Sequence, residues 1–160
     1  MTEPRKPARA TRADLSMVDA IAQLSFVIHG ALERRAGERD LSMIQTRLLG
    51  VLRDRTPTMN ELAKLLSLDK SSVTGLVDRA ERRGLVERIP STSDGRAVLV
   101  RLTVDGRRQV ADVAARFERD VAAIVATLST ADRKALGGLV SRVLVAHATT
   151  RGVDLFAATN

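Results

Sequence analysis

The spacing of hydrophobic residues predicts helices toward both ends of the chain and a more compact segment between them. Apolar residues recur at helical spacing over about residues 14–35 and 43–52, and again over about 104–128 and from 130 onward. Between these stretches, residues 58–103 combine two short helical patterns with an alternation of period two. The chain is therefore predicted to be mainly α-helical, with a small β-hairpin in its central part.

Capping residues predict where several helices begin. Ser42 and Gln45 have the spacing of a capping box before the helix expected from residue 43, and Thr103 can cap the helix expected from about residue 104.

The starts of the two short helices are marked in the same way. Thr58 and Glu61 have the spacing of a capping box, in which each side chain satisfies a backbone N–H of the first helical turn. Asp69 can cap a second helix that begins near Lys70, which leaves only two residues for the turn between the helices. A helix, a tight turn and a second helix are predicted.

A β-hairpin is predicted to follow the second helix. Gly84 can end that helix, because glycine readily adopts the left-handed conformation found after helix ends. Residues 85–89 and 97–103 then have the pattern of paired strands, and the polar, turn-rich residues 90–96 between them predict an exposed hairpin tip. Two helices followed by a β-ribbon form a winged helix-turn-helix, which binds duplex DNA.

The second helix has two different faces. Its apolar face consists of Val73, Leu76, Val77 and Ala80. The opposite face combines small residues near its start with arginines farther along, which suits a helix whose N-terminal end enters the major groove. Gly75 on this face costs about 1 kcal/mol relative to alanine, and close approach to a base or phosphate would explain it. A merely solvated face is the alternative.

Four motifs resemble those of the MarR family of bacterial transcription regulators. They are Thr58-x-x-Glu61-Leu62-Ala63, Ser71-Ser72-Val73-Thr74-x-Leu76-Val77-Asp78-Arg79, Arg83-Gly84-Leu85-Val86-Glu87-Arg88, and Asp94-x-Arg96-x-x-x-Val100-x-Leu102-Thr103-x-x-Gly106. Many regulators share the helix-turn-helix, but its combination with the last motif at these spacings is specific. The resemblance covers roughly residues 15–148. It implies a winged helix-turn-helix with N- and C-terminal dimerisation helices.

The resemblance also implies a role for the hairpin tip. In such proteins a wing arginine reaches into the minor groove while a nearby aspartate holds its guanidinium, and these roles fall on Arg96 and Asp94. A cation inserted there is attracted by the negative potential of a narrow A·T-rich groove. The alternative is a local salt bridge that stiffens an exposed hairpin, worth at most about 1 kcal/mol.

The flanking helices carry more apolar surface than the central segment can cover. Packing against a second copy is the expected outlet, with an intramolecular bundle as the alternative. A symmetric dimer would place two recognition helices about one DNA turn apart, roughly 34 Å, and so predicts a pseudo-palindromic site.

Regulation by a small molecule is a further implication of the resemblance. It implies a repressor, less often an activator, whose dimer spacing changes when an effector binds between the association helices and the DNA-binding part. Family members often take phenolic or other aromatic ligands there. His29 and Arg47 are considered for such a pocket, although neither belongs to a motif.

The charge balance fits a polyanionic partner. The chain has 26 Lys and Arg against 19 Asp and Glu, a formal net charge of +7, which also fits simple solubility. Residues 58–103 hold eight basic and six acidic residues, so this segment must act through a few well-placed cations. Residues 1–12 carry four basic residues and one acidic residue without helical periodicity. This tail either adds non-specific phosphate contacts or is inert.

Several other classes of function find no support. The chain has no cysteine for a disulfide or a thiol switch, and its two histidines, His29 and His147, lack the spacing of a metal site. Without a catalytic set or a phosphate loop, no enzymatic activity and no cofactor are predicted. The absence of a signal-peptide core and of any stretch near ~18 apolar residues predicts a cytoplasmic protein. Scarce aromatic residues argue against single-strand binding.

The sequence thus predicts a sequence-specific transcriptional regulator that binds double-stranded DNA as a homodimer. Alternatives are a nucleoid-type protein that coats DNA without sequence preference and a winged helix used only for protein pairing. The predicted regions are a basic flexible tail (1–12), an N-terminal dimerisation helix (13–40), the winged helix-turn-helix (41–103), a linker helix with a C-terminal dimerisation helix (104–148) and a C-terminal tail (149–160).

The predicted DNA-binding residues lie on the second helix, on the hairpin and at Thr58. They are Thr58, Lys70, Ser71, Ser72, Thr74, Gly75, Asp78, Arg79, Arg82, Arg88, Ser93, Asp94 and Arg96. Lys64 and Arg83 are further candidates for phosphate contacts. Asp78 is expected to orient Arg82, its i+4 neighbour, or to accept a hydrogen bond from a cytosine amino group.

Overall fold

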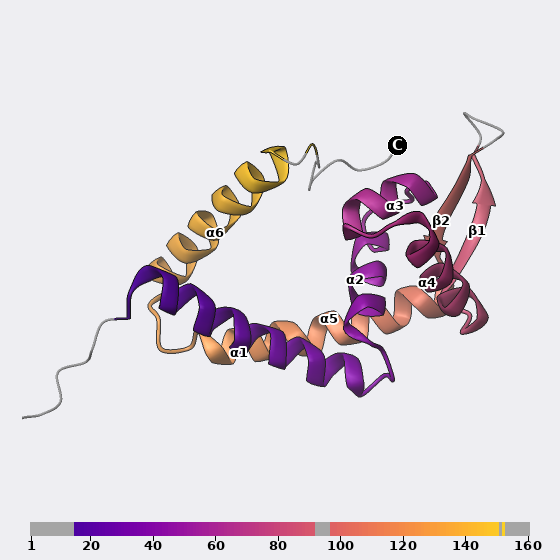
Figure 1. The fold of residues 1–160 in the computed structure, drawn as a ribbon. Coiled ribbons are helices and arrows are strands. Elements are labelled where there is room, and N and C mark those ends of the chain that lie inside the picture. The colour runs from indigo at the N-terminus through magenta and orange to yellow at the C-terminus, as the bar shows by residue number, and fades with distance from the viewer. Residues whose placement is uncertain (1–14, 92–96, 151, 153–160) are drawn as a thin grey trace, which may run out of the picture.

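The structure, a computed structural model, describes residues 15–91, 97–150 and 152. Four helices, one β-hairpin and two further helices follow one another along these residues (Figure 1). The order is α1 (Met17–Gly37), α2 (Met43–Leu52), α3 (Met59–Leu66), α4 (Lys70–Arg82), β1 (Val86–Pro90), β2 (Val98–Leu102), α5 (Val104–Ile124) and α6 (Thr130–Thr150). The prediction of a mainly α-helical chain with a β-hairpin is confirmed.

A small lobe sits at one end of a long helical arm (Figure 1). Helices α1 and α5 pack side by side to form the arm. Helices α2, α3 and α4 and the hairpin form the lobe, which the start of α5 joins directly to the arm. Helix α6 runs away from the opposite end of α5, so the lobe and α6 lie at opposite ends of the arm.

The hydrophobic core lies mainly in the lobe and reaches the arm through Ala36 of α1, Leu41 of the following loop and Val113 of α5. Apolar side chains from all helices of the lobe and both strands are buried together: Leu48, Leu49, Leu52, Leu62, Leu66, Val73, Leu76, Val77, Ala80, Leu85, Val86, Val100 and Leu102. The apolar face predicted for the second short helix is therefore the buried face of α4. Burying this face leaves the opposite face of α4 in solvent.

The predicted helix caps are confirmed. Thr58 and Ser42 each form a complete capping box, with Glu61 and Gln45 respectively. Asp69 caps α4 by accepting a hydrogen bond from the backbone N–H of Ser72 at 2.8 Å. Each of these contacts joins residues three positions apart, which is why the sequence alone identified them.

Removing the cap of α2 is expected to destabilise the lobe. The Ser42 side chain accepts from the Gln45 N–H at 3.3 Å, and Ser42→Ala removes that acceptor. We expect a loss of about 1 kcal/mol of unfolding free energy, seen as a melting temperature lower by about 2–4 °C. Ser42→Asp, which keeps an acceptor, should melt close to the parent. Equal melting of Ser42→Ala and the parent would contradict the role of this cap.

Two helix boundaries differ from the prediction. Helix α1 starts three residues later than expected because Ser16 caps it, accepting from the Asp19 N–H at 3.1 Å. Helix α5 ends at Ile124 rather than at residue 128. The segment between Ile124 and Ser129 instead forms turns that reverse the chain toward α6, and Ser129 accepts from the Asp132 N–H at 3.1 Å.

The hairpin is antiparallel and is also tied to the chain before α3. Its register runs from Val86 opposite Leu102 to Pro90 opposite Val98. The N–H of Val100 donates to the carbonyl of Pro57 at 2.9 Å, which attaches β2 to the segment leading into α3. The hairpin therefore has a fixed direction relative to the two helices of the helix-turn-helix.

Gly106 explains the spacing at the start of α5. A Cβ placed on Gly106 would lie 1.9 Å from the carbonyl oxygen of Leu85, so no other residue fits there without moving the backbone. Thr103, the cap of α5, donates its hydroxyl hydrogen to the carbonyl of Gly84 at 2.6 Å. The start of the arm is thus anchored to the chain that leaves the C-terminal end of α4.

Helix α6 and the outer part of α1 keep apolar side chains in solvent. In α6 these are Leu139, Val140, Val143, Leu144 and Val145, and in α1 they include Met17, Val18, Ile21, Phe26 and Val27. The described residues do not form the intramolecular bundle that the sequence left as an alternative. Among those residues, no helix is both long and apolar enough to cross a membrane.

Candidate nucleic-acid interface

The N-terminal end of α4 is organised around Asp69. Its carboxylate accepts hydrogen bonds from the hydroxyls of Ser71 at 2.6 Å and Ser72 at 2.7 Å, in addition to the Ser72 N–H. These bonds hold the pKa of Asp69 far below its usual range, with the Ser71 hydroxyl contributing most. Both serines were predicted to contact DNA. In the structure their hydroxyl hydrogens bond Asp69, so their oxygens are left to act as acceptors.

The face of α4 opposite the core is exposed, as predicted. Exposed positions on this helix include Lys70, Ser71, Ser72, Thr74, Arg79 and Arg82, while Gly75 and Asp78 are half-buried. The Thr74 hydroxyl donates to the Lys70 carbonyl at 2.8 Å. Polar residues predicted to meet DNA therefore form one continuous solvent-facing surface along α4.

Gly75 makes room for an arginine of its own helix. A Cβ at this position would lie 3.3 Å from a terminal nitrogen of Arg79. The Arg79 guanidinium therefore lies over Gly75 in the structure. Because this guanidinium is the far end of a flexible side chain, it could move by a few tenths of an ångström, so Arg79 alone does not require a glycine here. The close approach to DNA suggested by the sequence stays a prediction.

Arg88 joins the hairpin to α4. It extends from β1 and forms an ion pair with Asp78 at 2.6 Å and a second ion pair with Glu81. The expectation that Asp78 orients Arg82 is wrong, because Asp78 pairs across to the strand. Arg88, predicted to contact DNA, is held by two carboxylates and braces the hairpin against the helix.

Four other cations of the lobe have no such partner among the described residues. Within the part of the chain that the structure describes, the side chains of Lys64, Lys70, Arg79 and Arg82 form no hydrogen bond or ion pair. These four cations are therefore available to phosphates. Arg83 differs from them, because its guanidinium donates to two backbone carbonyls of the α1–α2 loop.

The remaining predicted residues lie at Thr58 and at the hairpin tip. Thr58 is half-buried, and its hydroxyl donates to Glu61 at 2.9 Å within the capping box. Ser93, Asp94 and Arg96 lie outside the described residues. On the two sides of that segment, the Ser91 N–H donates to the Ala97 carbonyl at 2.9 Å, which holds the ends of the loop together.

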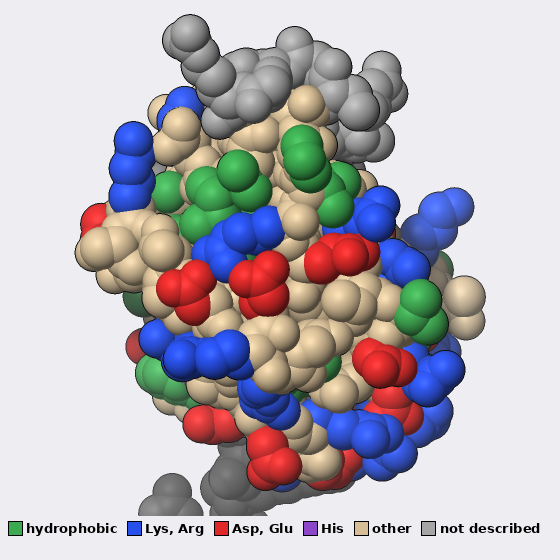
Figure 2. All heavy atoms as spheres, turned by 90° about the vertical axis from the view of Figure 1, so that its right-hand side faces the viewer, with side chains coloured by type: hydrophobic (Ala, Val, Ile, Leu, Met, Phe, Trp, Pro, Cys, Tyr) green, Lys and Arg blue, Asp and Glu red, His purple; other side chains and the backbone are tan. Residues whose placement is uncertain are grey.

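The surface of the lobe is mixed in charge. In Figure 2, which faces the lobe end of the molecule, Lys and Arg side chains alternate with Asp and Glu side chains. Glu87 and Arg101, opposite each other on the two strands, form one such pair at 2.8 Å. This mixture agrees with the nearly balanced count of basic and acidic residues in 58–103. Any contact with DNA would therefore depend on individual cations rather than on a broad basic surface.

The likeness to a known protein family covers most of the lobe. The sequence profile of the MarR family matches residues 39–97. The multiple antibiotic resistance protein MarR of Salmonella typhimurium is 48% identical over 46 residues, which are 29% of this chain and 32% of that protein. The HTH-type transcriptional repressor NicR of Pseudomonas putida is 31% identical over 114 residues, which are 66% of this chain and 72% of that protein. The chain belongs to the MarR family.

Solved structures extend the likeness of this MarR-family chain to the arm. A mutant of MarR from E. coli matches with a TM-score of 0.69 and 25% identity, covering 83% of this chain and 99% of that one. MepR of S. aureus, in the crystal structure of its complex with DNA, matches with a TM-score of 0.66 and 20% identity over 83% of this chain and 99% of that one. The sequence-based assignment of family and fold is confirmed.

Sequence reasoning missed two of the contacts that shape this interface. The pairing of Arg88 with Glu81 and the bonds from Arg83 to the α1–α2 loop both join separate elements. Neither follows a capping or i, i+4 rule, so the only signal was the presence of arginines beside acidic residues and helix ends.

Proposed function

We propose that the chain acts as a homodimeric transcriptional regulator that reads a pseudo-palindromic duplex site through α4. The observation that carries this proposal is the exposed face of α4, where Lys70, Arg79 and Arg82 lie beside small polar residues and have no partner among the residues that the structure describes. Such a face fits a helix that enters the major groove and contacts phosphates at its edges.

The uncovered apolar residues of α1 and α6 support a dimer. Val143 of α6 is 68% exposed and Met17 of α1 is 76% exposed, and both belong to longer apolar stretches. Contiguous exposed apolar surface of this kind marks an interface. The start of α1 lies near the start of α6 in Figure 1, so both stretches belong to the same end of the arm. A two-fold dimer through this end would leave both lobes free for DNA.

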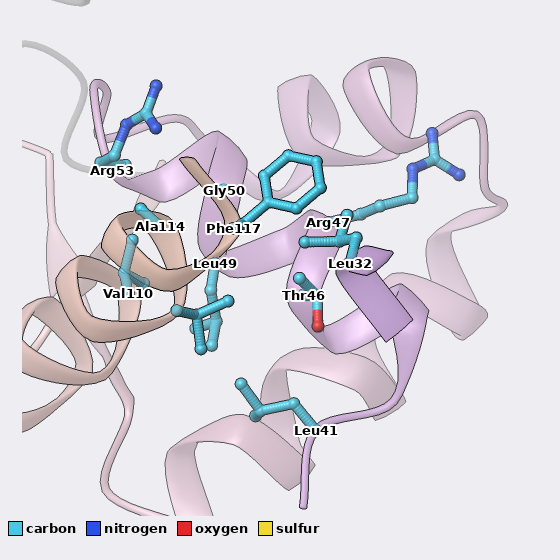
Figure 3. A pocket seen from close by; sticks show the side chains of 11 residues that line it. Leu32, Leu41, Thr46, Arg47, Leu49, Gly50, Arg53, Val110, Ala114 and Phe117 are labelled. Atoms are coloured by element: carbon cyan, nitrogen blue, oxygen red, sulfur yellow. The ribbon is translucent and has the colours of Figure 1, made fainter. Parts of the chain in front are cut away.

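A cavity between arm and lobe supports an effector site. It has a volume of about 250 Å³ and is lined by Leu32 of α1, by Leu41, by α2 residues and by Val110, Val113, Ala114 and Phe117 of α5. The walls are mainly apolar, and in Figure 3 the guanidinium groups of Arg47 and Arg53 point away from Leu49 and Val110. His29 is not among the lining residues. An aromatic ligand with an apolar body fits this lining.

Filling the cavity is expected to remove the response to an effector without removing DNA binding. Ala114→Phe would occupy the space, whereas Ala115→Phe would add the same ring at an exposed position on the same helix. We would screen simple phenols and benzoates for compounds that raise the melting temperature and weaken DNA binding of the parent. Compounds that act on the Ala115→Phe protein should be inactive on Ala114→Phe. Compounds that act equally on both variants would bind at another site, because an effector acts through a site where it binds one of two conformations better.

Removing the wing arginine is expected to weaken DNA binding at A·T-rich flanking positions. Arg96→Ala should lower duplex affinity by about 5- to 100-fold, with no change in melting temperature. Competition between duplexes that differ only in these flanks measures the effect. Unchanged affinity for all of these duplexes would show that Arg96 does not contact the minor groove.

The main competing function is non-specific coating of DNA. The charge of the N-terminal residues would favour it, and it predicts similar affinity for any sequence with a steep dependence on salt. A filter-binding titration that compares an enriched duplex with a scrambled duplex of equal composition separates the two. At near-physiological salt the proposal requires about 1000-fold or stronger preference for the enriched duplex.

A further inference from the structure

The C-terminal end of α4 is joined to the arm by the side chain of Arg83, which is not among the cations that carry the proposed function. Arg83 is the cap residue of α4, and its two terminal nitrogens donate to the carbonyl of Asp40 at 2.7 Å and to the carbonyl of Arg39 at 3.1 Å. A planar guanidinium with two parallel donors fixes direction as well as distance. This contact joins residues 43 and 44 positions apart in the chain.

The acceptors of Arg83 are the last carbonyls after α1. The N–H of Leu41 donates to Ala36 and the N–H of Asp40 donates to Gly37, both at 3.0 Å, and Asp40 has a φ of 53°. These bonds form a Schellman motif, which leaves the carbonyls of the following residues without helical partners. The negative end of the α1 dipole also favours a cation there. Arg83 therefore supplies hydrogen-bond donors to carbonyls at the C-terminal end of α1 that lack helical partners.

The same loop is fastened to α5 on its other side. The guanidinium of Arg39 donates to Asp112 at 2.6 and 3.0 Å, and Asp112 also accepts from Arg116 at 3.1 Å. Farther along the arm, Arg35 and Asp120 form a two-bonded pair at 2.7 Å for each bond. Hydrogen bonds to Arg39 and Arg35 respectively lower the pKa of both aspartates, so the pairs remain charged at neutral pH. The loop and the arm behave as one unit.

The end of the recognition helix is thus held at two separate points. On one side Gly84 and Leu85 accept hydrogen bonds from Thr103 at the start of α5. On the other side Arg83 holds the end of α1 through the loop. The core also joins lobe and arm, because Ala36, Leu41 and Val113 are buried in it, but apolar packing has no preferred direction. The hydrogen bonds from Thr103 and Arg83 add fixed directions to this packing and so restrict how the lobe can turn on the arm.

We propose that Arg83 is a positioning residue, which fixes the orientation of the lobe on the arm and thereby determines the half-site spacing that the dimer accepts. The inference rests on the proposed function, because spacing has meaning only for a dimer that reads two half-sites. One inserted base pair turns one half-site by about a tenth of a helical turn and moves it by about 3.4 Å. A rigidly held pair of lobes discriminates against that change, and a loosened pair tolerates it.

The test compares spacing selectivity rather than affinity alone. The probes are the inverted-repeat duplex enriched from a random pool by the parent protein, and derivatives with one or two base pairs inserted or removed between its half-sites. Arg83→Met keeps the apolar stem and removes the donors. We expect it to lower the preference for the original spacing by about tenfold while binding to an isolated half-site is unchanged. Arg83→Lys retains a cation that can reach one carbonyl, so its preference for the original spacing should lie between those of Arg83→Met and the parent.

A second variant separates this role from a direct phosphate contact. Asp112→Asn lies on α5 and weakens the hold of Arg39 on the arm. It should broaden spacing tolerance in the same direction, and it also serves if Arg83→Met does not fold. A uniform loss of affinity for all spacings, with a shallower salt dependence, would make Arg83 a phosphate contact and overturn the inference.

The outcomes for the parent protein keep the two proposals apart. Failure of the parent to prefer any spacing would refute the dimeric reader itself. A parent that discriminates, together with Arg83→Met and Asp112→Asn proteins that discriminate equally well, would refute only the role of Arg83. Dimer mass, measured by light scattering, should be the same for all three proteins.

Discussion

Arg82→Glu is expected to lower the affinity for an enriched duplex by at least about 100-fold at near-physiological salt. Arg82 is exposed at the C-terminal end of α4 and, among the described residues, has no protein partner. The substitution replaces attraction to a phosphate by repulsion, and a symmetric dimer carries it twice. The fold should not change, because the side chain packs against nothing in the core.

The salt dependence of binding gives an independent measure of the same loss. Removing one phosphate contact from each half of a dimer should reduce the slope of log affinity against log salt by about 2. Lys134→Glu is the matched control, since it makes the same change of charge at an exposed position of α6, far from the lobe. If Arg82→Glu instead breaks the dimer and leaves half-site binding intact, the recognition face has been assigned to the wrong surface.

Val143→Asp is expected to convert the dimer to a monomer. Val143 is 68% exposed in the single chain and belongs to an apolar stripe at helical spacing that also contains Leu136, Leu139, Val140 and Leu144. In a two-fold interface the new carboxylate would be buried twice without a partner, at a cost of several kcal/mol. Light scattering should report the mass of one chain at micromolar concentration.

Loss of the dimer should in turn weaken DNA binding. Each lobe would then bind alone, and affinity for the full inverted repeat should fall by about 100-fold or more. Ser141→Asp is the matched control because it places the same charge on the opposite side of α6, where the Ser141 hydroxyl donates to the carbonyl of Gly137 in its own helix. A Val143→Asp protein that remains dimeric would show that α6 does not carry the interface.

Local contacts account for what the sequence predicted well. The cap side chains of Ser42, Thr58, Asp69 and Thr103 each accept from the backbone N–H three positions later, so their spacing in the sequence was sufficient. The buried face of α4 followed from helical periodicity in the same way. The winged helix-turn-helix was therefore predictable from the sequence in order and nearly in its boundaries.

Contacts between elements account for what was missed. Asp78 was expected to pair along its own helix, but the hairpin brings Arg88 within 2.6 Å of it. Arg83 was considered for a phosphate, but the fold places the end of α1 beside it. The end of α5 at Ile124 depends on where the chain turns toward α6. In each case the competing partner lies in another element, whose position no local pattern contains.

Selection of bound duplexes from a random-sequence pool, at near-physiological salt, tests the central claim most directly because it presumes no target. We expect the enriched duplexes to contain an inverted repeat whose half-sites lie about one helical turn apart, 10–10.5 base pairs from centre to centre. Binding without enrichment of any sequence, or enrichment of single sites with no second half-site, would contradict a dimer that reads DNA through two copies of α4.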